Sequence, residues 1–148
     1  MKAKIFLLAM AVMFCLSACK TQSKTTTAQQ TTVELIDNHW KLTELNGAAV
    51  EVKKGEGKEP YLVLHGEGNR VNGNGGCNGF MGSYSIAGDK ISFSQMAMTM
   101  MACPSLDKEN EFMKVLEKVE KYTISATVFT LFDAESNLLA KFEVVFSN

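Results

Sequence analysis

Short segments with a two-residue period are the feature that most constrains the fold of this 148-residue chain. The segments are residues 39–45, 61–65, 84–86, 90–94, 128–132 and 138–146. Between them lie Gly, Asn and Asp residues that are typical of hairpin turns, as at 66–69 and 133–137. A side-chain period of two indicates strands with one buried face. The pattern therefore predicts an antiparallel meander or a barrel-like sheet.

One segment departs from this period and predicts a helix. Its apolar residues recur at helical spacing, at Leu106, Phe112, Met113, Leu116 and Val119. Charged residues, Glu109 among them, are assigned to the opposite face, and Pro104 and Ser105 suit a helix start. We expect a mainly β (α+β) fold with this one amphipathic helix packed on the sheet.

The N-terminus has the pattern of an export signal. Lys2 and Lys4 precede an apolar run at residues 5–16, which is too short to span the roughly 30 Å hydrocarbon core of a membrane. The next residues, 16–19 (LSAC), resemble the lipobox read by the lipoprotein signal peptidase. We predict a lipoprotein signal peptide at 1–18 and lipidation of Cys19. An ordinary secretory signal is the alternative, and it also exports the protein.

Residues 20–32 are polar and lack large apolar side chains, so they cannot bury enough surface to offset ordering. We interpret 19–32 as the lipidated cysteine and a flexible tether, which reaches about 20 Å on flexible-linker scaling. The remaining residues, 33–148, suit one domain with a core of its own.

The expected location is the bacterial cell envelope, with the membrane as a partner through the lipid anchor. Lys20 stands where an Asp retains enterobacterial lipoproteins at the inner membrane, so the outer membrane, facing the periplasm, is favoured. The leaflet stays open. The full chain has a formal charge of −1, which argues against a nucleic-acid partner.

Two cysteines remain in the predicted domain, Cys77 and Cys103. An even pair in an oxidising compartment favours a disulfide, which we predict. It would tie a glycine-rich stretch to the start of the helix. A redox-active pair and a thiolate metal site are the alternatives, although the chain has neither a CxxC spacing there nor a nearby His cluster.

Several segments together resemble the META domain family of HslJ-like lipoproteins. They are residues 76–84 (GCNGFMGSY), 97–103 (AMTMMAC), Glu111 and Phe112, 40–47 (WKLTELNG) and 131–133 (LFD). The resemblance implies a compact, mostly antiparallel barrel-like fold with one helix, in envelope lipoproteins linked to stress or antibiotic tolerance. It implies no agreed reaction and supplies no catalytic residues.

The glycine-rich stretch at 73–79 could suggest a phosphate cradle, but it lacks the Lys-Ser/Thr of a P-loop. We predict instead that its glycines allow positive φ, a bulge or close backbone packing. Gly76, Asn78 and Gly79 form the core of this loop, and Asn78 suits a turn. The choice between packing and recognition stays open here.

Met96, Met98 and Met100 would share one face of an extended strand, and aligned thioethers in an exported protein suggest a copper(I) site. Adaptable core packing under the helix is the favoured interpretation. His39 and His65 fall in separate predicted strands without ligand spacing, so no metal or other cofactor is assigned.

No catalytic constellation is visible, because the chain has no G-x-S-x-G elbow and its carboxylates are dispersed. We therefore expect a non-enzymatic envelope lipoprotein that acts as an interaction or stress-tolerance module on an unknown envelope protein. Alternatives are a small-ligand or copper-binding module and a hydrolase inhibitor. An exposed apolar patch would favour interaction, and a concave pocket with few polar groups would favour a ligand.

Overall fold

The computed structural model describes residues 33–52, 55, 57–104 and 106–146. The predicted signal peptide, Cys19 and the tether lie outside these described residues. Within them, no helix has the length and apolar character needed to cross a membrane.

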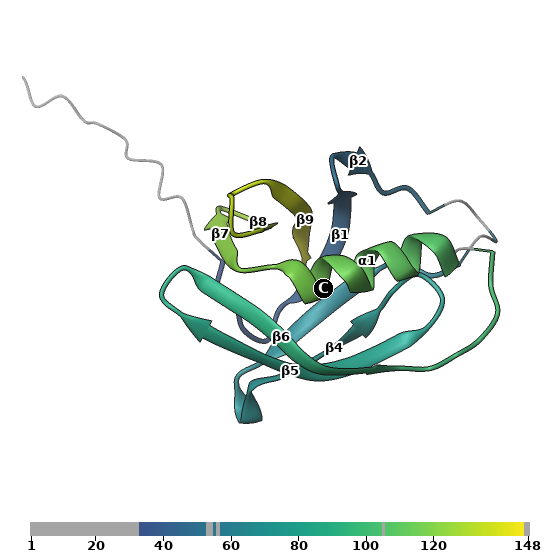
Figure 1. Ribbon diagram of the computed structural model, residues 1–148, viewed down its shortest axis with the longest axis horizontal. Coiled ribbons are helices and arrows are strands. Elements are labelled where there is room, and N and C mark those ends of the chain that lie inside the picture. The colour runs from purple at the N-terminus through teal and green to yellow at the C-terminus, as the bar shows by residue number, and fades with distance from the viewer. Residues whose placement is uncertain (1–32, 53–54, 56, 105, 147–148) are drawn as a thin grey trace, which may run out of the picture.

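The described chain forms one antiparallel sheet that closes into a barrel, with one α-helix (Figure 1). The elements are β1 (His39–Leu45), β2 (Ala48–Ala49), β3 (Tyr61–His65), the 3-10 turn η1 (Glu67–Asn69), β4 (Arg70–Asn74), β5 (Gly79–Ala87), β6 (Lys90–Met98), α1 (Leu106–Lys118), β7 (Lys121–Ser125), β8 (Val128–Phe132) and β9 (Leu138–Val145). The sheet order is β2-β1-β3-β4-β5-β6-β7-β8-β9, and β1 also pairs with β9. That pairing closes a ring of eight strands, with the short β2 outside it.

β1 has two different partners along one edge. Its first half, His39–Lys41, pairs with β3, whereas Glu44 and Leu45 pair with β2. A bulge between Leu42 and Glu44 shifts the period, so that Leu45 joins Leu42 among the buried residues. We call the opening of the barrel between β2 and β3 the mouth.

α1 lies between β6 and β7 in the chain and crosses the front of the barrel in Figure 1. Its Phe112 ring inserts among core aromatics, with ring centroids 5.8 Å from Phe80 and 5.9 Å from Phe142. Trp40 is fully buried, and its indole N–H donates to the Leu35 carbonyl at 2.8 Å. Such burial of large aromatics dominates the stabilisation of a small core.

The predicted fold class is confirmed, and α1 begins at the predicted Leu106. The strand pattern missed β4 and β7. The sequence of β4, RVNGN, contains a Gly and two Asn residues that normally indicate turns.

Candidate functional site

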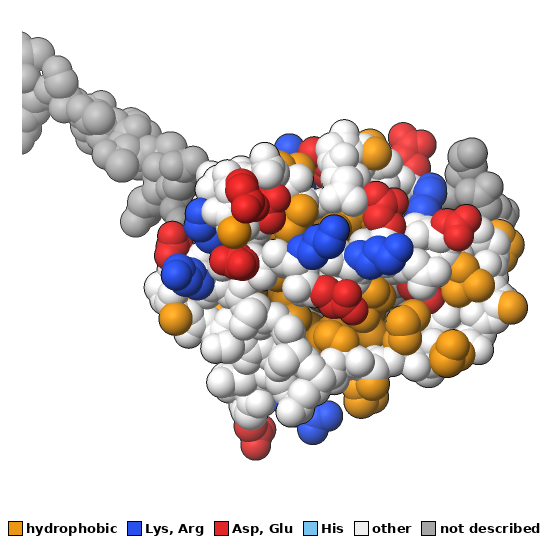
Figure 2. Space-filling view, in the orientation of Figure 1, with side chains coloured by type: hydrophobic (Ala, Val, Ile, Leu, Met, Phe, Trp, Pro, Cys, Tyr) orange, Lys and Arg blue, Asp and Glu red, His pale blue; other side chains and the backbone are white. Residues whose placement is uncertain are grey.

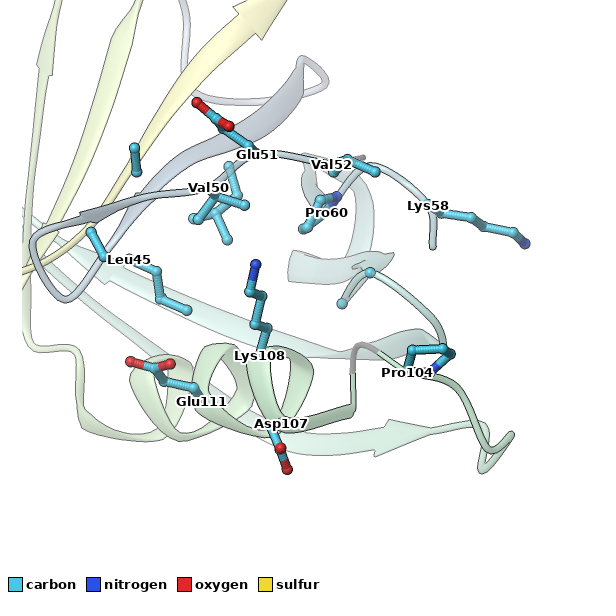
Figure 3. Close-up of a pocket in the computed structure, with 15 residues that line it drawn as sticks. Leu45, Val50, Glu51, Val52, Lys58, Pro60, Pro104, Asp107, Lys108 and Glu111 are labelled. Atoms are coloured by element: carbon cyan, nitrogen blue, oxygen red, sulfur yellow. The ribbon is translucent and has the colours of Figure 1, made fainter. Parts of the chain in front are cut away.

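A cavity of about 350 Å³ opens at the barrel mouth, between the β1–β2 hairpin, the segment before β3 and the start of α1 (Figure 3). Its lining is mainly apolar and includes Leu42, Leu45, Ala48, Ala49, Val50, Val52, Pro60 and Pro104. The backbone of Gly75 and Gly76 completes one wall. Two backbone hydrogen bonds hold the mouth, from Leu42 N to Pro60 O at 2.9 Å and from Val50 N to Thr43 O at 2.9 Å.

Lys108 is the charged side chain that enters this space. In Figure 3 it rises from α1 towards Val50, with its ammonium group between the helix and the β1–β2 segment. Among the described residues, Lys108 Nζ has no hydrogen bond or ion pair. The ammonium group is therefore available to a ligand.

The carboxylates at the rim are directed elsewhere. Glu111 Oε1 accepts a hydrogen bond from Asn46 Nδ2 at 2.7 Å. The side chains of Asp107 and Glu51 point away from the centre of the cavity in Figure 3. Lys58 also lines the cavity, but its side chain points outward in the same view. The interior thus presents one positive group above an apolar lining.

Glu109 lies on the buried face of α1, contrary to the prediction, and supports the wall of the cavity. It was assigned to the charged face of the helix, but its side chain is 0% exposed. Its Oε2 accepts hydrogen bonds from Cys77 N at 3.1 Å and Asn78 N at 2.5 Å, and its Oε1 accepts one from Asn78 Nδ2 at 2.7 Å. The reason lies in the helical period, because residue 109 shares a face with 112, 113 and 116.

Asn78 links the glycine-rich loop to the segment that follows β6. Its Oδ1 accepts from Thr99 Oγ1 at 2.8 Å and from Met101 N at 2.7 Å, and its Nδ2 also donates to Met101 O at 3.1 Å. Its side chain is 1% exposed and connects the loop, the segment after β6 and the helix through hydrogen bonds. The expectation of a turn residue understated this role.

The predicted disulfide is confirmed, and Cys77 and Cys103 have Cα atoms 6.1 Å apart. It joins the loop to the segment just before α1. We call Glu109, Asn78 and this disulfide the clamp. The clamp fixes the wall formed by Gly75 and Gly76 by covalent and hydrogen bonds at once.

Close packing explains the glycines of the loop. A Cβ at Gly75 would lie 2.5 Å from Glu109 Cγ, and one at Gly73 would lie 2.1 Å from the Tyr61 carbonyl oxygen. Gly76 has φ +117°, and its N–H donates to Asn74 Oδ1 at 2.8 Å. At Gly79 the nearest atom to a Cβ would be 3.7 Å away, so that position is not crowded.

The three methionines of the copper hypothesis do not form one stripe. Met96 and Met98 are partly buried and pack against the core, whereas Met100 lies beyond the end of β6 and is 94% exposed. Gln95 has φ 54°, and the register of the β5–β6 pairing shifts there. Because β6 ends at Met98, the strand does not align Met100 with the other two.

Exposed methionines form a separate feature of the surface. Met81 is 57%, Met100 94% and Met101 52% exposed, and we call these three the methionine surface. Figure 2 shows hydrophobic side chains gathering beside α1, on the side where β6 leads into the segment before the helix. Charged side chains cover the exposed face of α1 in the same view.

Two groups outside the cavity have displaced pKa values. Burial, with a smaller contribution from Asp37, raises the pKa of Tyr84, whose hydroxyl donates to His65 O at 2.9 Å. Hydrogen bonding to Asn137 lowers the pKa of Asp133. His65 itself contacts Asp37 and Asn72, and His39 stacks on Tyr61 at 4.1 Å. Within the described residues, no three His, Cys, Asp or Glu side chains gather as metal ligands would.

Comparisons with known proteins agree on the fold. An NMR structure of a protein from Burkholderia xenovorans is 24% identical, with a TM-score of 0.61 over 76% of this chain and 85% of that one. A second NMR structure is 24% identical, with a TM-score of 0.57 over 74% and 91% of the two chains. A crystal structure of a DUF4847 family protein from Bacteroides vulgatus is 14% identical, with a TM-score of 0.55 over 77% and 96%.

Those three chains consist of little more than the matched region, so a barrel of this fold forms without a further domain. No curated protein sequence matches the chain. The model of the META domain matches residues 33–145, which include every strand described above and α1. The chain belongs to the META domain family.

Proposed function

We propose that the protein is a non-enzymatic, lipid-anchored envelope module that binds a small molecule at the mouth of its META barrel. The mouth cavity carries this proposal. Its volume of about 350 Å³ lies at the lower end of the range for small-molecule sites, and its lining is mostly apolar with few polar groups.

The clamp orders one wall of the cavity before a ligand binds, which supports the proposal of a preformed binding site. Gly75 and Gly76 form one wall, and the hydrogen bonds to Glu109 and the disulfide hold that wall in place. A wall that is already ordered loses little conformational entropy when a ligand enters. The cavity should therefore keep its shape in the free protein.

The lining favours binding over catalysis. The described residues that line the cavity include no Ser, Cys, His or Tyr, so a hydroxyl or thiol nucleophile and an imidazole base are both missing from it. The side chains of Glu51, Lys58 and Asp107 point away from the centre in Figure 3. Lys108 and Glu111 are then the remaining candidates for proton transfer, and Glu111 is engaged by Asn46. Such an arrangement orients a ligand more readily than it activates one.

The predicted export signal and the family resemblance support a role in the envelope. The ligand would then be a molecule met outside the cytoplasm, and its binding would contribute to stress or antibiotic tolerance. Intact mass spectrometry of the membrane-extracted protein tests the anchor. We expect a triacylated N-terminal Cys19, and an unlipidated full-length product would contradict the proposal.

A titration of the 33–148 domain with small apolar molecules, followed by ¹⁵N HSQC spectra, tests the binding itself. We expect shift changes at Leu42, Leu45, Val50 and Lys108. The matched control is Ala49→Phe, an exposed lining position where a large ring fills the cavity. Shift changes that persist unchanged in this variant would contradict binding at the mouth.

The methionine surface favours a second candidate function, the docking of an envelope protein. Met100 is 94% exposed, and flexible methionines are common at adaptable binding surfaces. A cross-linking experiment with a photoreactive residue at position 100 tests it. Capture of one defined envelope protein would support docking, and the absence of any adduct would count against it.

A further inference from the structure

We infer that the mouth cavity selects an amphipathic carboxylate, with Lys108 holding the carboxylate and the apolar walls holding the tail. This inference rests on the proposed function, because it names the ligand class of the same cavity. It is carried by the contrast between the Lys108 ammonium group, which points into the cavity without a described partner, and the apolar lining around it.

Three lysines of the barrel have side-chain partners among the described residues. Lys41 pairs with Glu59 at 2.6 Å, and Lys141 pairs with Glu44 at 2.7 Å. Lys121 donates to the Ala134 carbonyl at 2.9 Å and to Ser136 Oγ at 3.0 Å. The ammonium groups of Lys108 and Lys58, which both line the cavity, have no partner among the described residues, but in Figure 3 only Lys108 of the two extends into the cavity.

The direction of the Lys108 side chain matters as much as its lack of a partner. It extends into the cavity in Figure 3, towards Val50 and across from Leu45. A ligand that displaces water from these apolar walls also lowers the local dielectric constant around the ammonium group. An anionic head group on that ligand is therefore held more strongly than the same anion on an open surface.

The neighbouring carboxylates do not supply the missing partner. Asn46 holds Glu111 at the rim, 2.7 Å from its amide nitrogen. Asp107 and Glu51 point away from the centre. These acids also limit the ligand to a single negative charge, because a di- or trianion would meet their field at the mouth.

The size of the cavity sets the length of the tail. Taking about 30 Å³ for each water in the liquid, the space of about 350 Å³ holds roughly a dozen water-sized groups. A straight-chain acid of eight to ten carbons is of this order. Octanoate is the probe that fits both the charge and the volume.

The experiment titrates the 33–148 domain with octanoate, 1-octanol and octylammonium, using ¹⁵N HSQC spectra to follow the cavity residues. We expect octanoate to bind most tightly, 1-octanol more weakly and octylammonium most weakly. Lys108→Gln should weaken octanoate binding about twofold to fivefold, the range of an exposed ion pair, and leave 1-octanol binding unchanged.

Lys114→Gln is the matched control, because Lys114 lies on the same helix, is exposed and does not line the cavity. It should leave octanoate binding unchanged. If Lys108→Gln and Lys114→Gln have the same effect, or if octanoate and 1-octanol bind equally, the inference is wrong while the proposed function survives. If none of the three probes binds in the cavity, the proposed function fails with it.

A free fatty acid and a fatty acid held in a bilayer both present a carboxylate on an apolar tail. A second experiment distinguishes these two sources of the ligand. Phosphatidylcholine vesicles with and without oleate are mixed with the native and Lys108→Gln domains. Binding to free octanoate alone assigns a soluble ligand. Binding that needs oleate in the vesicle and requires Lys108 assigns a membrane source.

Discussion

Lys108 and Glu109 are neighbours on α1, yet the fold treats their charges in opposite ways. Glu109 is fully buried and accepts three hydrogen bonds from the glycine-rich loop. Lys108 is exposed, points into the cavity, and has no partner among the described residues. The two side chains are separated by about 100° around the helix, enough to place one in the core and the other at the mouth.

Of these two charged side chains, Glu109 contributes to the stability of the fold, whereas Lys108 is available to a ligand. A buried charged group must have its hydrogen bonds satisfied, and removal of either partner leaves the other desolvated. An exposed and unpaired charge contributes little to folding. Glu109 therefore belongs to the clamp that shapes the wall, and Lys108 belongs to the space that the wall encloses.

Glu109→Ala should cause the largest loss of stability among the variants that test this comparison. It leaves three buried donors on Cys77 and Asn78 without an acceptor, and we expect a loss of about 4 kcal/mol in the free energy of unfolding. Urea denaturation measures it. Glu111→Ala, on the exposed face, is the control with an expected change below about 0.5 kcal/mol. Equal losses in the two variants would remove the distinction.

The disulfide should come next. The Cys77→Ala/Cys103→Ala double variant opens a loop with a sequence separation of 26. The chain-entropy model gives a loss of about 3.5 kcal/mol in the free energy of unfolding. Denaturation of the double variant and of the native domain, each with and without reductant, measures it. If reductant destabilises the double variant as much as the native domain, the loss does not come from the disulfide.

Gly75→Ala should have an intermediate effect, because the new methyl group would overlap Glu109, with Cγ 2.5 Å and Oε2 2.8 Å away. We expect a loss of about 2 kcal/mol by overpacking. Gly79→Ala is the matched control, since its nearest atom would be 3.7 Å away. Thermal unfolding of both variants checks the order, and a larger loss at Gly79 would contradict the packing described here.

Tyr84 offers a buried group with one hydrogen bond, to His65 O. Tyr84→Phe should cost about 1 kcal/mol at neutral pH. Because burial raises the pKa of Tyr84, its contribution is full below about pH 10 and is lost as the pH rises through the folded-state value. Unfolding curves between pH 7 and 11 should show the gap between native and variant closing in alkali. A constant gap would contradict this.

Lys108→Gln should have the smallest effect on stability, below about 0.5 kcal/mol, because no described partner loses a contact. The same urea denaturation that tests Glu109→Ala measures it. A loss of several kcal/mol would show that Lys108 is part of the structural framework after all.

Local sequence patterns predicted most of the fold. The two-residue period found β1, β3 and the late strands, and the helical spacing found α1. β4 was missed because its turn-like residues serve other roles. Gly73 is required by close packing against Tyr61, and the side chains of Asn72 and Asn74 form hydrogen bonds with His65 and Gly76. Met100 was misplaced because β6 ends at Met98.

Of the clamp, the disulfide was predicted from the sequence and the buried position of Glu109 was not. The disulfide followed from an even pair of cysteines in a domain predicted to be exported. The spacing of Glu109 from Phe112 and Leu116 was present but was set aside because of its charge. The cavity could not be predicted. Its walls come from β1, the segment before β3, the glycine-rich loop and α1, and only the closed barrel brings these together.

The central claim is that the mouth cavity, rather than the methionine surface, takes up a small amphipathic ligand. Intermolecular NOEs between octanoate and the methyl groups of the 33–148 domain test it most directly. We predict NOEs from the octanoate methylenes to Leu42, Leu45 and Val50. NOEs confined to the methyl groups of Met81, Met100 and Met101 would contradict the claim and move the binding site to the methionine surface.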